Sequence, residues 1–254
     1  MSGYGPAAMP SGATAVVWAP AKLTLSLRLT GVRPDGYHLI DAMMVTLDLA
    51  DRLEIGPGDG FEVHGGAADV PAGADNLVVR ALALARRRAQ VSLHKVIPSQ
   101  AGLGGGSADA AAVLRWAGFD DRAEAALLGA DVPFCLAGGR ARVQGIGERV
   151  EPLTFVAETY TLMTPPAACP TPAVFRAWDD LGGPVGVEGG NDLEPAALAV
   201  APALARWRDE LSEATGYRAT LAGSGSTWFV PGAHPGPGRR VVHTTPSGWA
   251  GPDR

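Results

Sequence analysis

The pattern becomes regular along Val16–Thr30, and hydrophobic and polar positions alternate from Lys22 to Thr30, where every second position from 23 to 29 is leucine. A period of two is typical of a β-strand with one apolar face. Lys22 has the polar parity of this strand, together with Thr24 and Ser26. A turn is predicted directly afterwards at Arg33–Gly36, which contains Pro, Asp and Gly. The chain therefore begins its regular structure with a strand whose polar positions include two basic side chains, Lys22 and Arg28.

The pattern then switches repeatedly between strand and helix. Asn76 precedes apolar residues at helical spacing and is predicted to cap a helix over 77–85. Thr171-Pro172 has the composition of a helix start with Thr as the cap, and Gly216 is predicted to end one or two helices over 192–215. Further helices are predicted at 108–117 and 122–128, a flexible connector at 182–190, and strands at 43–49, 52–55, 61–64, 91–97, 140–144, 160–163, 218–222, 227–230 and 239–244.

This mixture predicts an α+β protein with an antiparallel or mixed sheet. The boundary between two domains is placed near 150–157. The predicted organisation is a flexible lead-in over 1–14, an N-terminal domain over 15–152, a C-terminal domain over 153–245 and a tail over 246–254.

Composition narrows the class of protein. Of 254 residues, 46% are hydrophobic and 19% charged, which supports a packed core rather than disorder. The net charge of −5 argues against a nucleic-acid partner. Apolar runs stay shorter than the roughly 18–20 residues of a membrane helix, and no signal peptide is recognised, so no membrane association is expected. Two cysteines form no disulfide framework, and a reduced cytoplasmic setting is expected.

Lysine is rare in this chain. Of 21 basic residues only Lys22 and Lys95 are lysines. An ammonium is a compact point charge, whereas a guanidinium is a planar fork. Each lysine therefore occupies a position that requires an ammonium, or is present there by chance.

The strongest local signal for chemistry is a glycine-rich loop between a predicted strand and a predicted helix. Four of the five residues Gly102–Gly106 are glycine, and Ser107 follows. Such a loop brings backbone N–H groups and a helix N-terminus to an anion such as a phosphate. The loop lacks the lysine of a Walker A motif and the last glycine of a dinucleotide fingerprint, and Asp109 breaks a nucleophile elbow. A phosphate loop outside these three classes is predicted, with a merely flexible turn as the alternative.

Several segments together resemble the GHMP kinase superfamily. They are collinear, span roughly 16–230, and comprise Pro20-Ala21-Lys22-Leu23, Asp35-Gly36-Tyr37-His38, Pro98–Asp109, Leu128–Phe134, Thr171–Phe175, Asn191–Glu194 and Gly223–Ser226. The glycine loop marks the superfamily. The segments 35–38 and 129–133 resemble its branch that acts on a cytidine-diphosphate-linked sugar alcohol.

The resemblance implies a two-domain GHMP kinase-like fold with the active site in the cleft between an ATP-binding N-terminal domain and a substrate-binding C-terminal domain. It implies transfer of the ATP γ-phosphoryl group to the 2-hydroxyl of a cytidine-diphosphate-linked methylerythritol, a step of non-mevalonate isoprenoid biosynthesis, with Mg²⁺ as cofactor. Metal ligands stay unassigned. A small-molecule substrate and a monomer or weak homodimer are expected.

Site residues follow from the same resemblance. Asp131 would take the proton of the acceptor hydroxyl. Lys22 would keep the Asp131 carboxylate ionised and stabilise charge on the acceptor oxygen. Tyr37 and Phe175 would stack on the cytosine and His38 would hydrogen-bond its edge, while Thr24, Gly223, Ser224 and Gly225 would complete the substrate site. ATP would contact Pro98, Ser99, Gln100, Ala101, Gly102, Leu103, Gly104, Gly105, Gly106, Ser107 and Ala108.

The chain departs from the family pattern in several respects, including a shorter stretch before Val91 and a shorter C-terminal end. Thr24 occupies the position two residues after the lysine where the family has asparagine, and the segment before Asp131 is shorter by about one short helix. A kinase for another small alcohol and a nucleotide-binding paralogue without catalysis are the alternatives. Core packing for Phe175, a turn for His38 and a helix cap for Asp131 are the alternative roles of these residues.

Overall fold

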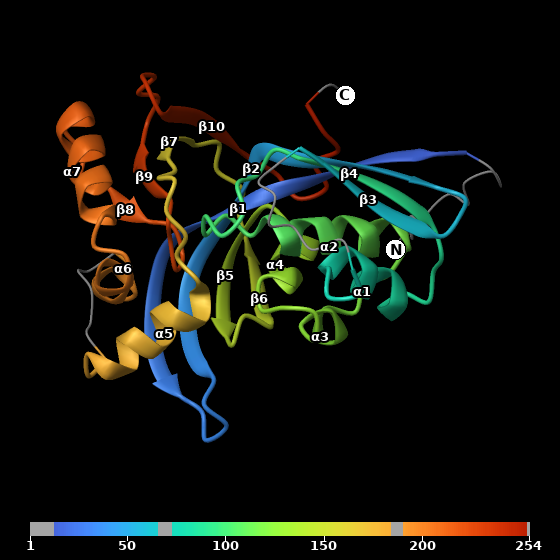
Figure 1. Cartoon of the computed structure of the whole chain (residues 1–254), viewed down its shortest axis with the longest axis horizontal. Helices are drawn as coiled ribbons and strands as arrows, with labels where there is room; N and C mark the ends of the chain where they lie inside the picture. The colour runs from blue at the N-terminus through green and yellow to red at the C-terminus, as the bar shows by residue number, and fades with distance from the viewer. Residues whose placement is uncertain (1–12, 66–72, 184–189, 253–254) are drawn as a thin grey trace.

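The computed structural model describes residues 13–65, 73–183 and 190–252. Within these ranges the strands form one mixed sheet, with β3-β4-β2-β10-β7-β9-β8 as its main path, and β1 and β5 also pair with β2. Figure 1 shows α1 to α4 gathered at one end of the molecule and α5 to α7 at the other. The strands are β1 Ala15–Val32, β2 His38–Gly56, β3 Gly60–Gly65, β4 Gln90–Lys95, β5 Arg140–Gly145, β6 Arg149–Leu153, β7 Thr159–Met163, β8 Thr220–Leu221, β9 Trp228–Pro231 and β10 Arg239–Thr245. The helices are α1 Leu77–Leu84, α2 Gly105–Trp116, α3 Arg122–Ala125, α4 Val132–Ala137, α5 Thr171–Asp180, α6 Glu194–Val200 and α7 Leu204–Thr215.

Strand β2 is one continuous element, so the prediction of two strands at 43–49 and 52–55 was wrong. The predicted break fell at Asp51, a residue disfavoured in strands. In the structure the Asp51 carboxylate is buried and accepts hydrogen bonds from the backbone N–H groups of Val96 (2.5 Å) and Ile97 (2.8 Å). These long-range partners compensate the low strand propensity, and they explain why the local pattern misplaced the break.

The polar face of β1 is buried around Lys22 and becomes exposed toward Thr30. Lys22 and Thr24 are both buried, although the alternation assigned them to the face opposite the leucines. The pairing of β1 with β2 shifts register between Pro20 and Lys22 and again between Thr24 and Ser26. Such irregularities redirect side chains locally, and here they accompany a polar pair buried inside the protein.

Most predicted helices are confirmed, with changes at their ends. The side chain of Asn76 caps α1 by accepting a hydrogen bond from the Val78 N–H at 2.8 Å. Helix α2 begins inside the glycine loop, and α3 is shorter than the predicted 122–128. Thr171 is the first residue of α5 rather than its cap, which is Pro170. Helix α4 and strand β6 were not predicted: α4 has only 6 residues, and Pro152 interrupts the strand pattern of β6.

Other predictions fall partly or wholly outside the described residues. The lead-in over 1–14 is described only for its last two residues, and the connector at 182–190 is largely outside the described ranges. The tail over 246–254 is described as far as residue 252. The division into two domains stays a prediction, since β10 pairs with both β2 and β7 and so joins the two halves of the chain.

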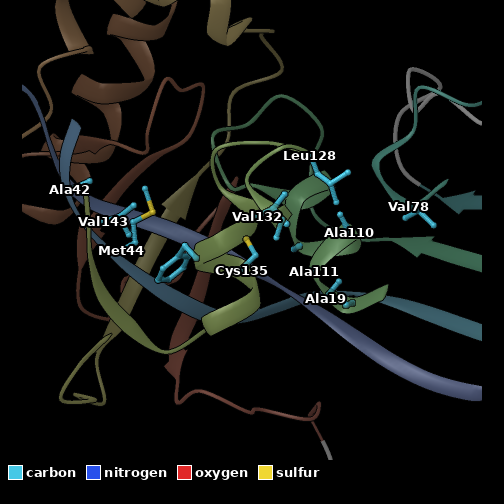
Figure 2. Packing of buried hydrophobic residues seen from close by; sticks show 14 of the residues in the cluster. Ala19, Ala42, Met44, Val78, Ala110, Ala111, Leu128, Val132, Cys135 and Val143 are labelled. Carbon is cyan, nitrogen blue, oxygen red and sulfur yellow. The ribbon is translucent and has the colours of Figure 1, made fainter. Parts of the chain in front are cut away.

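The core of the N-terminal half forms around α2. Its alanines are buried, and the helix packs against α1, α4 and β1. Figure 2 shows Ala110 and Ala111 close to Leu128, Val132 and Cys135. Small side chains let neighbouring elements approach closely, so the glycine loop that precedes α2 is fixed to a rigid support. Both cysteines are buried and free. Among the described residues, no helix is long and apolar enough to span a membrane.

The contribution of helix α2 to the stability of the protein can be measured by substituting Leu114, a fully buried residue near the end of this helix. Replacing Leu114 with alanine should lower the free energy of unfolding by about 2–5 kcal/mol, because the change leaves a cavity. Leu127→Ala is the matched control: this leucine is 71% exposed, and its replacement should change stability by less than about 0.5 kcal/mol. Urea unfolding followed by circular dichroism measures both. Equal effects of the two changes would contradict the assignment of α2 to the core.

Candidate active site

A cavity of about 1020 Å³ collects residues from widely separated segments. Its walls include the glycine loop, the start of α4, the beginning of β2, the first turns of α5 and the loop at 223–224. Of the residues predicted for the site it is lined by Lys22, Thr24, Tyr37, His38, Pro98, Ser99, Gln100, Ala101, Gly102, Gly104, Gly105, Gly106, Ser107, Asp131, Phe175, Gly223 and Ser224. The fold therefore brings most of the predicted residues to one place.

Three predicted residues do not line this cavity. Leu103 and Ala108 are buried in the protein core, and Gly225 contacts the core from the other side of its loop. Leu103 lies within the glycine loop and Ala108 shortly after it, and their buried side chains anchor the loop to the core. Their contribution to a ligand would be limited to the backbone.

An ion pair lies at the wall of the cavity. The Nζ atom of Lys22 lies 3.4 Å from Oδ2 of Asp131 and donates a hydrogen bond to Oγ1 of Thr24 at 3.0 Å. The Lys22 side chain is 5% exposed and that of Asp131 is 32% exposed. A buried ammonium requires such partners, because its desolvation is costly. Thr24 thus supplies an acceptor at the position where an asparagine was expected.

Asp131 stands at the N-cap position of α4, yet its side chain makes no capping hydrogen bond. The alternative role of a helix cap is therefore wrong for this carboxylate. Its oxygens face Lys22 and the cavity instead. A half-exposed carboxylate beside a buried ammonium is suited to accept a proton from a bound hydroxyl group.

The glycine loop leads directly into the N-terminus of α2. Gly104 is the N-cap residue with φ = 67°, and Gln100 also adopts a positive φ of 53°. A Cβ atom on Gly104 would lie 2.8 Å from Cγ of Lys22, so only glycine fits beside this lysine. The first N–H groups of a helix have no partner within it, and they attract anions. The arrangement can therefore bind phosphate next to the ion pair.

A second glycine-rich segment, 223–226, closes the cavity from the C-terminal half. A Cβ atom on Gly102 would lie 2.0 Å from the carbonyl oxygen of Ala222, so the two loops are in direct contact. The Thr227 N–H also donates to the carbonyl oxygen of Ala101 at 3.2 Å. Because both loops surround Lys22, each restricts where the ammonium can lie.

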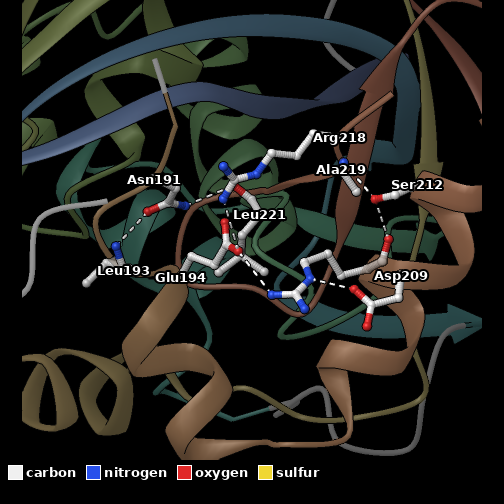
Figure 3. Close-up of polar contacts among 9 residues, drawn as sticks. Asn191, Leu193, Glu194, Asp209, Ser212, Arg218, Ala219 and Leu221 are labelled. Carbon is white, nitrogen blue, oxygen red and sulfur yellow. Dashed lines mark hydrogen bonds and ion pairs between the residues drawn. The ribbon is translucent and has the colours of Figure 1, made fainter. Parts of the chain in front are cut away.

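Asn191 holds this second loop in place. Its Nδ2 donates to the carbonyl oxygens of Leu221 (2.9 Å) and Gly223 (2.6 Å), and its Oδ1 accepts from the Leu193 N–H (2.9 Å). Figure 3 shows Asn191 beside a polar network around Glu194. In that network Arg208 and Arg218 both lie near the Glu194 carboxylate, at 3.5 and 3.7 Å. The network ties α6 and α7 to the strand that precedes the loop.

The second lysine of the chain is also buried at the cavity wall. Nζ of Lys95 donates to Oδ2 of Asp109 at 2.8 Å and to Oδ2 of Asp51. A Cβ atom on Gly105 would lie 3.1 Å from this Nζ, so the ammonium is directly beneath the glycine loop. Both lysines therefore occupy positions that require a compact ammonium.

Two carboxylates share this one ammonium, and they are not equivalent. Asp51 accepts two backbone hydrogen bonds in addition, whereas Oδ1 of Asp109 has no partner among the described residues. Burial and the neighbouring Asp51 raise the pKa of Asp109 to about 8, although Lys95 opposes the shift. Burial alone would lower the pKa of Lys95, but the two carboxylates raise it. Asp109 is thus the member of the cluster that holds a proton.

The far end of the cavity carries aromatic side chains. Tyr37 and Phe175 line it from the turn before β2 and from α5. The His38 ring lies 4.8 Å from the Phe175 ring, and its Nε2 is 2.8 Å from Oδ1 of Asp179. Ser224 shares a hydrogen bond of 2.8 Å with the hydroxyl of Thr171 at the start of α5. This end can bind a flat, partly polar group.

Sequence reasoning missed four polar residues of the site: Asp51, Asp109, Thr171 and Asp179. Asp109 and Thr171 lie in segments that resemble the family, but they were given no role in the site: Asp109 was noted as the residue that breaks a motif, and Thr171 as a presumed cap. Asp51 and Asp179 carried no local signal, since their partners are far away in the chain: 44 residues separate Asp51 from Lys95, and 141 separate His38 from Asp179. Their contacts arise only when the sheet forms.

The donor set was also compared with the requirements of a metal ion. Within the described ranges, no group of three or more His, Cys, Asp or Glu side chains is arranged to hold a metal. Mg²⁺ commonly keeps several waters and binds through one or two protein oxygens plus substrate phosphates. The residues present fit that mode, with Ser107 and Asp131 as oxygen donors at the cavity.

Comparison with known proteins places this geometry among small-molecule kinases. Residues 76–139 match the GHMP kinases N terminal domain. A protein of Paracoccus denitrificans (strain Pd 1222) named 4-diphosphocytidyl-2-C-methyl-D-erythritol kinase is 40% identical over 91% of this chain and 93% of its own length. A crystal structure of 4-(cytidine 5'-diphospho)-2C-methyl-D-erythritol kinase superposes with a TM-score of 0.72 at 32% identity, over 91% of this chain and 99% of that chain. A homoserine kinase from Cytophaga hutchinsonii shares the fold with a TM-score of 0.60 at 18% identity, over 94% and 96% of the two chains.

The proton on Asp109 predicts a specific pH dependence of stability. The folded protein keeps this proton up to about pH 8, whereas the unfolded chain releases it near 3.8. Folding therefore takes up a proton between these values, and stability falls as pH rises, by about 1.4 kcal/mol for each unit. The Asp109→Asn variant has no carboxyl group at this position, so its stability lacks this dependence on pH. Between pH 5 and pH 7, urea unfolding should show the wild type losing about 2.7 kcal/mol relative to the variant. Parallel pH profiles for the two proteins would contradict the assignment.

Proposed function

Because this chain belongs to the family of 4-diphosphocytidyl-2-C-methyl-D-erythritol kinases, we propose that it transfers the γ-phosphoryl group of ATP to the 2-hydroxyl of 4-diphosphocytidyl-2-C-methyl-D-erythritol. The observation that carries this proposal is the Lys22–Asp131 ion pair, 3.4 Å long, between two glycine-rich loops. Phosphoryl transfer depends mainly on alignment and on neutralisation of charge, and both groups are available at this point of the cavity.

The triphosphate of ATP would bind over the glycine loop. The N-terminus of α2 and the backbone N–H groups of residues 102–107 supply positive potential there. Lys95 beneath Gly105 stabilises the loop through its buried carboxylate partners. A Mg²⁺ ion would be held mainly by the nucleotide phosphates, with Ser107 and Asp131 of the cavity wall as protein oxygen donors, and it would neutralise charge on the triphosphate.

The acceptor would enter with its cytidine at the aromatic end of the cavity. Tyr37 and Phe175 would stack on the base, and His38 would hydrogen-bond its edge. Stacking on an aromatic side chain contributes about 1–3 kcal/mol per base in nucleic-acid systems. The 223–226 loop, held by Asn191, would contact the diphosphate through its backbone. The acceptor hydroxyl would then lie between Asp131 and the γ-phosphate.

In the reaction, the acceptor oxygen attacks the γ-phosphorus and its proton passes to the Asp131 carboxylate. The bond between the γ-phosphorus and the bridging oxygen breaks, and ADP leaves. Lys22 lies beside Asp131 and stabilises negative charge on the attacking oxygen. Thr24 orients the Lys22 ammonium because its hydroxyl oxygen accepts a hydrogen bond from one of the three N–H groups.

All residues assigned to this reaction come from a single chain. The substrate is a small molecule, in agreement with the names of the relatives. We expect the protein to act as a monomer or weak homodimer, because no second copy is required to complete the cavity.

The proposed base is tested by Asp131→Asn, which keeps the shape of the side chain but removes the proton acceptor. The kcat with the cytidine-linked acceptor should fall by roughly 10²–10⁴. The KM for ATP should stay within roughly threefold, since the triphosphate site is formed by other groups. A coupled assay of ADP release measures both. Asp120→Asn, at an exposed carboxylate outside the cavity, is the control and should leave kcat unchanged. A near wild-type kcat in Asp131→Asn would exclude Asp131 as the base.

A further inference from the structure

Asp179 on α5 makes a contact that the reaction described above does not use. Its Oδ1 lies 2.8 Å from Nε2 of His38, and both residues line the cavity. The His38 side chain is 11% exposed, and its ring contacts two aromatic residues of α5: Phe175 at 4.8 Å and, edge-on at 84°, Trp178 at 5.6 Å. The imidazole is therefore held in one orientation between β2 and α5.

This contact determines which nitrogen of His38 carries hydrogen. A carboxylate can only accept a hydrogen bond, so Nε2 must be the donor. In a neutral imidazole the other nitrogen is then a bare acceptor. Among the described residues, Nδ1 of His38 has no hydrogen-bond partner, so it is available to a bound molecule.

A bare acceptor discriminates between the two pyrimidine bases. Cytosine carries an amino group at position 4, which donates, whereas uracil carries a carbonyl oxygen there, which accepts. An unprotonated Nδ1 pairs with the amino group and repels the carbonyl oxygen. The opposite tautomer, with hydrogen on Nδ1, would favour uracil.

We propose that Asp179 is a positioning residue that fixes the His38 tautomer and thereby selects cytidine over uridine in the acceptor. The proposal rests on the proposed function, in which the base of the acceptor reaches His38. Asp179 itself does not contact the base. It acts through His38, because it fixes the tautomer of the ring that contacts the base.

The test compares acceptors that differ only in the base: cytidine-diphosphate-linked and uridine-diphosphate-linked methylerythritol. In the wild type, kcat/KM should favour the cytidine compound. In Asp179→Asn, an amide can either accept from Nε2 or donate to it, so both tautomers become accessible. The ratio of the two kcat/KM values should then fall at least about tenfold, through a loss for cytidine and a gain for uridine.

Asp180→Asn is the matched control, because this neighbouring carboxylate on α5 is exposed and does not line the cavity. It should keep the wild-type ratio. A purely structural role for Asp179 would lower kcat/KM equally for both acceptors, and an unchanged ratio in Asp179→Asn would therefore overturn the proposal. Absence of wild-type turnover with the cytidine compound would instead reject the proposed function, so the two failures are distinguishable.

Nuclear magnetic resonance provides a second measurement that does not depend on activity. The ¹⁵N shifts of the His38 ring in the wild type should show hydrogen on Nε2 and a bare Nδ1. The Asp179→Asn variant should show a mixture of tautomers. Hydrogen on Nδ1 in the wild-type protein would contradict the proposal, whatever the kinetics.

Discussion

The site depends on one buried cation. The Lys22 ammonium lies almost entirely out of solvent, and it is tolerable there because Asp131 and Thr24 surround it with oxygen atoms. Asp131 begins a helix while Lys22 lies within a strand, so the ion pair forms only when α4 has docked against β1. Folding and assembly of the reacting groups are therefore the same event.

Close packing of two glycine-rich loops makes this arrangement possible. Gly104 leaves room for the stem of Lys22, Gly223 leaves room for its Nζ, and Gly102 lets the first loop touch the second. A side chain at any of these positions would collide with backbone or with the lysine. The loops therefore act as a matched pair, which fixes the ammonium relative to the proposed triphosphate site. The buried Lys95 cluster supports the first loop from below, and Asn191 supports the second from the C-terminal half.

Sequence reasoning could predict the parts of this site that have local signatures. Strand β1 has a clear period, the glycine loop a distinct composition, and the collinear motifs identified Lys22 and Asp131 together. The burial of Lys22 could not be read from the same period, because bulges in the β1–β2 pairing break the alternation. Asp51 was read as a strand break, since its compensating hydrogen bonds come from the end of β4. Asp179 carried no signal, because its role depends on α5 lying next to the start of β2. Residues whose function is set by a distant partner are invisible to patterns that extend over a few positions.

A crystal structure with a non-hydrolysable ATP analogue and the cytidine-linked acceptor tests the central claim most directly. The account predicts that the acceptor hydroxyl lies within hydrogen-bond distance of the Asp131 carboxylate, facing the γ-phosphate above the glycine loop, with Lys22 beside it. An acceptor hydroxyl bound away from Asp131, or a triphosphate bound outside the glycine loop, would contradict it.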